Sequence, residues 1–192
     1  MMPMIRECVV TTADGPEAEC AVHIAPLGLI VQEPYWTIAP FRPSSTLDNL
    51  RAHPFAVANF IDDVRIIAGC LTGRRDWPLA TVDGFPVPRL AACLAHATLV
   101  VEDVEEDEQR PRFRCRVLEV VNHAPFMGFN RAKAAVVELA ILVSRLDMLP
   151  REKIEAEIAY LSIAVSKTAG PQEQLAWDWL MERVRQHFAQ PA

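Results

Sequence analysis

The chain has 192 residues, of which 51% are hydrophobic, 23% charged and 7% aromatic. This length and composition can bury a sizeable core, which excludes a disordered or fibrous protein. The 25 acidic and 19 basic side chains give a formal net charge of −6, so the chain has no general electrostatic attraction to nucleic acid or to anionic lipid. The sequence contains neither a signal peptide nor an apolar run of membrane-spanning length. We therefore expect a soluble, cytoplasmic protein with no nucleic-acid or membrane partner.

The cysteines and histidines give no metal-binding pattern. The five cysteines are scattered and form no Cys-x-x-Cys pair: Cys8, Cys20, Cys70, Cys93 and Cys115. An odd number without such a pair predicts reduced, mostly buried residues rather than a disulfide framework or a thiolate zinc site. His-x-x-x-His and Glu-x-x-His pairs are also missing, so we predict no metal. His23 and His96, in or beside apolar strands, are interpreted as hydrogen-bonded core residues.

The N-terminal part of the chain is predicted to be mostly strand. A β-hairpin is expected from Ile5 to Thr12 and from Ala21 to Ala25, around the turn residues 13–16. Pro26 and Gly28 are expected to interrupt its second strand.

The next segments alternate between strand and helix. Tyr35 to Phe41 is predicted to be extended, Leu47 to Arg51 a short helix, and Phe55 to Ile61 a buried strand. Residues 62–71 are predicted to form a helix capped by the two leading aspartates. Residues 74–90, rich in proline, are predicted to be loop.

Two longer strands are predicted from Ala97 to Val104 and from Arg112 to Val121. Residues 102–108 between them form an acidic run. We interpret this run as a solvated hairpin tip rather than a metal site, because neighbouring carboxylates in a flexible segment have no enforced convergence.

The apolar period becomes helical near the C-terminus, where three helices are predicted to begin at Asn130, Pro150 and Pro171. We therefore expect a β-rich domain over residues 1–125 and a helical region over residues 126–192 that packs on it. This combination is of the α+β class.

The best local signal for a ligand is the segment from Arg42 to Thr46. A guanidinium and three hydroxyls, from Ser44, Ser45 and Thr46, stand beside a predicted helix N-terminus. Such a terminus offers unpaired N–H groups and a positive dipole end, so one reading is a cradle for a phosphate group. The alternative is a structural cap, because Ser45-x-x-Asp48 matches a capping box with Asp in place of Glu, and Ser44 can also cap.

A second candidate for anion binding is the start of the helix after Asn130. Arg131 and Lys133 lie in its first turn, where cations oppose the helix dipole. One reading is that they meet a bound anion, and the other is that they reach solvent or a carboxylate such as Glu138. Asn130 is also an ordinary N-cap residue. Hydrolase, dinucleotide-fold and P-loop motifs are absent from the sequence, and no catalytic acid or base is evident.

Five segments spread over nearly the whole chain share their pattern with one protein family: ECVVTTADG, HIAPLGL, FRPSSTLDNL, VANFIDDV and GFNRAKAAVVELAILVSRLDML. They resemble segments of uncharacterised flavoproteins found in methanogenic archaea and in bacteria that use methanopterin. Members of this family are similar in fold to flavin reductases. The resemblance therefore implies an FMN-binding split β-barrel that forms a homodimer, with FMN at or near the subunit interface.

The resemblance also implies which residues contact FMN. The phosphate would be held at the predicted helix start, the isoalloxazine edge would lie on a backbone segment near Gly28, and further polar contacts would come from three other places. In chain order these residues are Ala25, Pro26, Gly28, Arg42, Ser44, Ser45, Thr46, Asn49, Asn59, Asn130, Arg131 and Lys133.

The function implied by this resemblance is that of an FMN-dependent oxidoreductase acting on a small molecule. The reaction is expected to belong to tetrahydromethanopterin-linked one-carbon metabolism or to the biosynthesis of that cofactor. The alternative is a non-catalytic flavin or pterin binding protein. A DNA-binding role is disfavoured by the net charge of −6.

Overall fold

The computed structural model describes residues 3–16 and 20–189. These residues divide into two compact units. The first unit contains the described residues of 1–61 and 77–125, and the second those of 62–76 and 126–192. Residues 62–76, predicted as part of the β-rich domain, thus belong to the helical unit.

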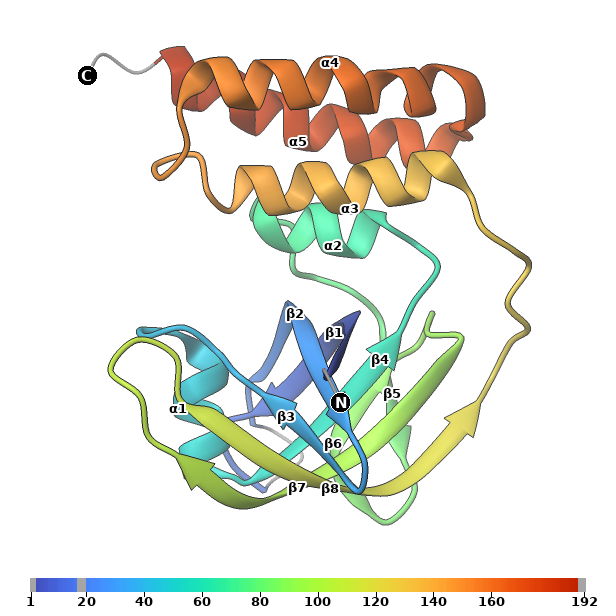
Figure 1. Cartoon of the computed structure of the whole chain (residues 1–192). Helices are drawn as coiled ribbons and strands as arrows, with labels where there is room; N and C mark the ends of the chain where they lie inside the picture. The colour runs from blue at the N-terminus through green and yellow to red at the C-terminus, as the bar shows by residue number, and fades with distance from the viewer. Residues whose placement is uncertain (1–2, 17–19, 190–192) are drawn as a thin grey trace. The chain divides into compact units, whose positions relative to one another are not determined.

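The first unit is a closed antiparallel barrel (Figure 1). Its strands are arranged in the order β1-β2-β3-β8-β7-β4 and close through pairing of β4 with β1. The bounds are β1 (Met4–Ala13), β2 (Val22–Gln32), β3 (Tyr35–Ile38), β4 (Phe55–Phe60), β7 (Ala95–Glu105) and β8 (Arg112–Asn122). A short helix, α1 (Ser45–Ala52), and a separate hairpin of β5 (Leu79–Val82) and β6 (Phe85–Leu90) complete the unit. The predicted α+β class and split-barrel fold are confirmed.

The barrel interior is filled by alternate residues of its strands. Side chains with almost no exposure there include Leu29, Ile38, Leu99 and Phe113. Because strand residues alternate between faces, the opposite set points outward. Part of that outer face, at Val57, packs against the β5–β6 hairpin.

The predicted interruption at Pro26 and Gly28 is wrong, because β2 continues through both residues to Gln32. Proline is tolerated at this point because β3 pairs only with residues 30–32 of β2, so Pro26 has a ladder neighbour on one side only, Val9. At Gly28 the neighbouring strand lies close, since an added Cβ would be 2.9 Å from a methyl group of Ile5.

The prediction of loop over residues 74–90 is also wrong, because this segment contains β5 and β6. The two strands turn at Gly84, which has a positive φ of 67° that favours glycine. Prolines concealed the pattern, but they are compatible with a two-stranded sheet in which every strand is an edge.

The second unit is helical. Its elements are α2 (Arg65–Leu71), α3 (Arg131–Val143), α4 (Arg151–Thr168) and α5 (Pro171–Ala189). The three predicted C-terminal helices are confirmed, and α3, the most apolar of them, contacts α2, α4 and α5. Among the helices that the structure describes, none has the length and apolar character needed to cross a membrane.

The start of α3 is fixed by polar contacts within the second unit. Asn130 is the N-cap, and its side-chain oxygen accepts hydrogen bonds from the amides of Ala132 (2.8 Å) and Lys133 (3.1 Å). The Lys133 ammonium forms an ion pair with Asp62 and lies 3.9 Å from Glu173. Lys133 therefore has carboxylate partners, but these are Asp62 and Glu173 instead of Glu138.

Asn59 forms the most connected polar site of the first unit. Its side chain is fully buried in β4. The amide nitrogen donates to the carbonyls of Val9 (2.9 Å) and Val57 (3.1 Å), and the amide oxygen accepts from the backbone N–H of Leu90 (2.7 Å). One side chain thus links β1, β4 and β6.

We expect Asn59→Ala to lower the free energy of unfolding of the flavin-free protein by about 3 kcal/mol, because several buried backbone groups lose their partner. Urea denaturation gives this value. The matched control is Asn49→Ala, which removes one side-chain hydrogen bond, to Thr12 Oγ1 (3.1 Å), and should cost about 1 kcal/mol. Equal losses in the two variants would contradict the linking role of Asn59.

A second prediction concerns the basic pair of α3. Lys133→Gln should destabilise the flavin-free protein by about 1–2 kcal/mol, since it leaves the partly buried carboxylates of Asp62 and Glu173 without their cation. Arg131 is exposed, so Arg131→Gln should change the stability by less than about 0.5 kcal/mol. Thermal and urea unfolding of both variants provide the measurement, and similar stabilities would overturn the structural role of Lys133.

Candidate functional site

The N-terminus of α1 has the geometry of a capped helix. Ser44 is the N-cap, and its hydroxyl accepts a hydrogen bond from the amide of Leu47 (3.3 Å). The N-cap is therefore Ser44, whereas the capping-box pattern Ser45-x-x-Asp48 would have placed the cap at Ser45. Helix geometry leaves the amides of Ser45 and Thr46 without a carbonyl partner inside the helix. The cap and an anion site are thus compatible at this helix end.

Arg42 stands next to this helix end and is held by the turn between β7 and β8. Its guanidinium donates to the Glu106 carboxylate (2.6 Å) and to the carbonyl of Asp107 (3.1 Å). Arg51, in the last turn of α1, donates to both oxygens of the same Glu106 (2.7 and 2.8 Å). The predicted hairpin tip over residues 102–108 is only partly correct, because β7 continues through Glu105 and only residues 106–108 lie in the turn. Glu106 also has two specific partners that were not predicted.

The second carboxylate of this tip is occupied by backbone groups. The amides of Gln109 and Arg110 donate to Asp107, at 2.9 and 2.6 Å, and these bonds lower the pKa of its carboxyl. Arg110 in turn donates to the carbonyl of Ala39 (2.7 Å). Glu106 is therefore shared by two arginines, Arg42 and Arg51, while Asp107 is used by backbone amides.

The other predicted FMN contacts of the first unit lie on neighbouring strands. The helix α1 contacts β1 and β2, and Asn49 reaches Thr12 of β1. Ala25 and Gly28 are half-buried in β2. Gly28 pairs with Glu7, five residues along β1 from Thr12, which is about 17 Å of strand. The structure therefore spreads these residues along one pair of strands beside α1.

Four predicted FMN contacts do not lie on this pair of strands: Asn59, which is in β4, and Asn130, Arg131 and Lys133, which are in the second unit. Both ends of the Asn59 amide are bonded within the first unit, and its predicted flavin contact stays a prediction. Asn130, Arg131 and Lys133 belong to the second unit, so their predicted role at the phosphate stays a prediction as well.

A cluster that the sequence analysis missed lies where β7 begins and β8 ends. His96 Nδ1 and His123 Nε2 are 2.8 Å apart, and their rings stack with centroids at 5.0 Å and an angle of 6°. Together with Cys93, they place three possible ligand atoms within 4.8 Å of one another. The signal was available as Cys93-x-x-His96, a spacing that the search for Cys-x-x-Cys and His-His pairs did not include.

The protonation of this cluster is shifted by its surroundings. Burial, followed by the charges of His123 and Arg89, lowers the pKa of His96, and burial followed by Arg89 lowers the pKa of His123. Burial also raises the pKa of the Cys93 thiol. Two neutral imidazoles and a thiol are therefore the favoured forms near neutral pH.

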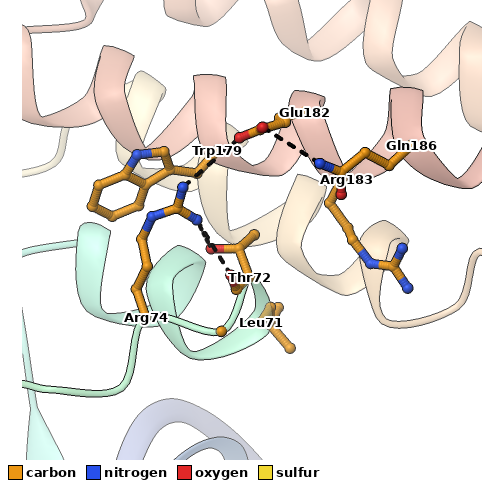
Figure 2. Close-up of a pocket in the computed structure, with 8 residues that line it drawn as sticks. Leu71, Thr72, Arg74, Trp179, Glu182, Arg183 and Gln186 are labelled. Carbon is orange, nitrogen blue, oxygen red and sulfur yellow. Dashed lines mark hydrogen bonds and ion pairs between the residues drawn. The ribbon is translucent and has the colours of Figure 1, made fainter.

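The second unit contains a hollow of about 380 Å³ (Figure 2). It lies between the end of α2 and the last turns of α5. The guanidinium of Arg74 is 4.6 Å from the ring centre of Trp179, 3.7 Å from Glu182 and 2.9 Å from the Thr72 hydroxyl. Its cation is thus engaged with protein groups, and none of the sequence-predicted site residues line this hollow.

Comparison with known proteins identifies the family. A family model described as protein of unknown function (DUF447), N-terminal domain, matches residues 6–124, and the DUF447 C-terminal model matches residues 130–182. A search of curated proteins finds no match.

Solved structures agree in fold. The FMN-bound DUF447 protein MM1853 from Methanosarcina mazei matches with a TM-score of 0.80 and 20% identity, over 93% of this chain and 94% of that one. The 2-nitrobenzoate 2-nitroreductase NbaA of Pseudomonas fluorescens matches with a TM-score of 0.51 and 17% identity, over 64% and 65%. An FMN-binding protein from Thermus thermophilus matches with a TM-score of 0.50 and 18% identity, over 62% and 71%. With family models covering most of its length, the chain belongs to the DUF447 family, which confirms the family resemblance of its sequence.

Proposed function

We propose that this protein binds FMN and that the start of α1 holds the FMN phosphate. The observation that carries the proposal is the similarity, over nearly the full length of both chains, to a DUF447 protein whose crystal structure contains FMN. The Thermus thermophilus protein of similar barrel fold is also FMN-binding.

The chemistry of α1 suits a phosphate group. The amides of Ser45 and Thr46, which have no carbonyl partner inside the helix, and the positive end of the helix dipole favour an anion at this end. Hydroxyl groups of neighbouring residues and the guanidinium of Arg42 add donors of the kind that phosphate accepts. This is the point at which the residues present fit the cofactor best.

Glu106 would compete with a bound phosphate for the guanidinium of Arg42. Arg42 donates to Glu106, so a phosphate would share or replace that carboxylate at Arg42. Arg51 provides a second cation that retains Glu106. The exchange is electrostatically feasible, because an exposed ion pair contributes only about 0–1 kcal/mol.

The reaction we propose is a flavin-dependent oxidation or reduction of a small molecule. Bound FMN supplies hydride or single-electron chemistry, while the protein positions the reactants and excludes competing reactions. One solved structure of similar fold is a nitroreductase, which supports an oxidoreductase. A link to tetrahydromethanopterin metabolism is part of the proposal, and a non-catalytic flavin or pterin binder is the alternative. Oxidation of NADH or NADPH that requires FMN would support the enzyme, whereas bound flavin without turnover would support the binder.

We also propose a cytoplasmic homodimer. Large apolar side chains are exposed in the segment that follows β8, with 84% exposure at Met127 and 100% at Phe129. Leu118 and Val120 of β8 are about half exposed as well, at 45% and 51%. Exposed apolar groups in such number are typical of a protein interface.

We expect Arg42→Ala to weaken FMN binding by about 10- to 150-fold, because a hydrogen bond to a charged group contributes about 1.5–3 kcal/mol. Fluorescence titration of FMN measures the affinity. The matched control is Arg51→Ala: Arg51 shares the partner Glu106 and has a side-chain exposure of 44%, against 34% for Arg42. Arg51 has no proposed contact with the phosphate, so its loss should weaken FMN binding much less than the loss of Arg42 does.

Thermal melting of both flavin-free variants separates binding from folding. Each variant loses one exposed ion pair, so their melting temperatures should be similar. Unchanged FMN affinity in Arg42→Ala would exclude Arg42 from the phosphate site. Failure of the parent protein to bind FMN at all would overturn the proposed function itself.

The dimer gives a separate prediction. Sedimentation equilibrium at micromolar concentration, with FMN present, should give twice the chain mass of 21.5 kDa. Phe129→Ser removes the most exposed aromatic side chain and should weaken the association if this segment takes part in it. A monomer in the parent protein would refute the homodimer.

A further inference from the structure

We propose that Cys93, His96 and His123 form a binding site for a divalent transition metal ion, with zinc as the best fit. The three residues belong to the first unit and come from two places in the chain, the segment that enters β7 and the residue that follows β8. They are separate from the residues that the FMN proposal uses.

The distances are close to those of a zinc site. The three candidate ligand atoms lie within 4.8 Å of one another, and the two imidazole nitrogens are 2.8 Å apart. Zinc binds nitrogen at about 2.0–2.1 Å and thiolate at about 2.3 Å. Tetrahedral angles then place two nitrogen ligands about 3.3 Å apart. Coordination therefore requires the two ring nitrogens to separate by about half an ångström. It also requires Cys93 Sγ to lie about 3.6 Å from each nitrogen, against the 4.8 Å within which the three atoms now lie.

Backbone hydrogen bonds hold the three residues in place from both sides. The amide of Leu94 donates to the carbonyl of Phe60 (2.8 Å), which attaches the Cys93 loop to β4. The carbonyl of Leu94 accepts from the amides of His123 (2.7 Å) and Ala124 (3.1 Å). The site is therefore largely positioned before any ion arrives, which favours binding.

One ring nitrogen of the cluster, His96 Nε2, is buried without a hydrogen-bond partner among the described residues. His96 is 3% exposed, and its Nε2 has no hydrogen-bond partner among the residues that the structure describes. A buried polar atom without a partner costs free energy. His96 Nδ1 already faces His123, and Nε2 lies on the other side of the ring. The buried imidazole is therefore only partly satisfied by His123, and the geometry of the three ligand atoms carries the proposal.

The donor set selects the metal. Two neutral imidazoles and one thiolate are borderline to soft ligands, a combination that suits zinc better than magnesium or calcium. Three protein ligands leave the fourth position for water, and the exposed His123 places the site next to solvent. Arg89 donates to Cys93 Sγ at 3.7 Å and to the carbonyl of Leu90 at 3.0 Å. It can therefore support the thiolate while its own position is fixed by the backbone.

Cobalt titration tests the site, because Co²⁺ replaces Zn²⁺ at such sites and is coloured. Protein prepared without a histidine tag and stripped with a chelator is titrated with Co²⁺. We expect saturation at one equivalent, with a thiolate-to-cobalt charge-transfer band and the visible bands of four-coordinate cobalt. Added Zn²⁺ should remove both sets of bands, because zinc binds such sites more tightly than cobalt.

Two ligand variants and two controls define the result. Cys93→Ala should lose the charge-transfer band, and His123→Ala, at an exposed position, should lose saturable binding. Cys20→Ser and His187→Ala lie outside the cluster and should bind as the parent does. Zn²⁺ should raise the melting temperature of the parent and the controls but not of the ligand variants. Absence of one-equivalent binding in the parent, or unchanged bands in Cys93→Ala and His123→Ala, would overturn the proposal.

Discussion

The side-chain amide of Asn59 joins strands that the sheet ladders leave separate, since β5 and β6 form their own two-stranded sheet. By accepting from the amide of Leu90, Asn59 holds the end of β6 beside β4. The carbonyl of Leu90 then accepts from the amide of Cys93 (3.4 Å), and His96 is the ladder partner of Asn59 on β7. The hairpin and the Cys93 loop are therefore both linked to one buried amide, whose loss would leave several groups unpaired in a low dielectric. The hydroxyl of Thr11, which donates to the carbonyl of Pro88 (2.6 Å), is a second polar link to β6.

The charges at α1 show how an acidic protein can still present an anion site. The net charge of −6 describes the whole chain, whereas an anion at the start of α1 responds to groups within about a Debye length, roughly 10 Å. There, one carboxylate, Glu106, serves two arginines, and Asp107 is used by backbone amides. Composition thus excludes a general polyanion binder without excluding a local phosphate site.

Sequence patterns identified the elements that have strong local signals. The three C-terminal helices follow from the apolar period and from the residues at which they begin, such as the N-cap Asn130. For α1 the sequence offered Ser44 or Ser45 as the N-cap, and the structure has Ser44. The β5–β6 hairpin was not predicted because proline normally argues against a strand. Proline is compatible with an edge strand, and the sequence alone does not show that both strands of this sheet are edges. His123 lies 27 residues from His96, so their contact depends on the register of β7 with β8, which local sequence does not specify.

The register of the same two strands also separates the two proposed sites. Glu106 follows the last residue of β7, at the closed end of the β7–β8 hairpin, whereas His96 and His123 lie at its open end. Ten residues of strand span at most about 34 Å, and screening at physiological ionic strength reduces the interaction of exposed charges beyond about 8 Å. A metal ion at the open end therefore has little direct electrostatic effect on a phosphate beside Arg42. Any coupling between the two sites would have to pass through the strands themselves. The Cys93 loop joins the barrel directly, through the bond from the Leu94 amide to the Phe60 carbonyl on β4 and through the ladder of β7 with β8.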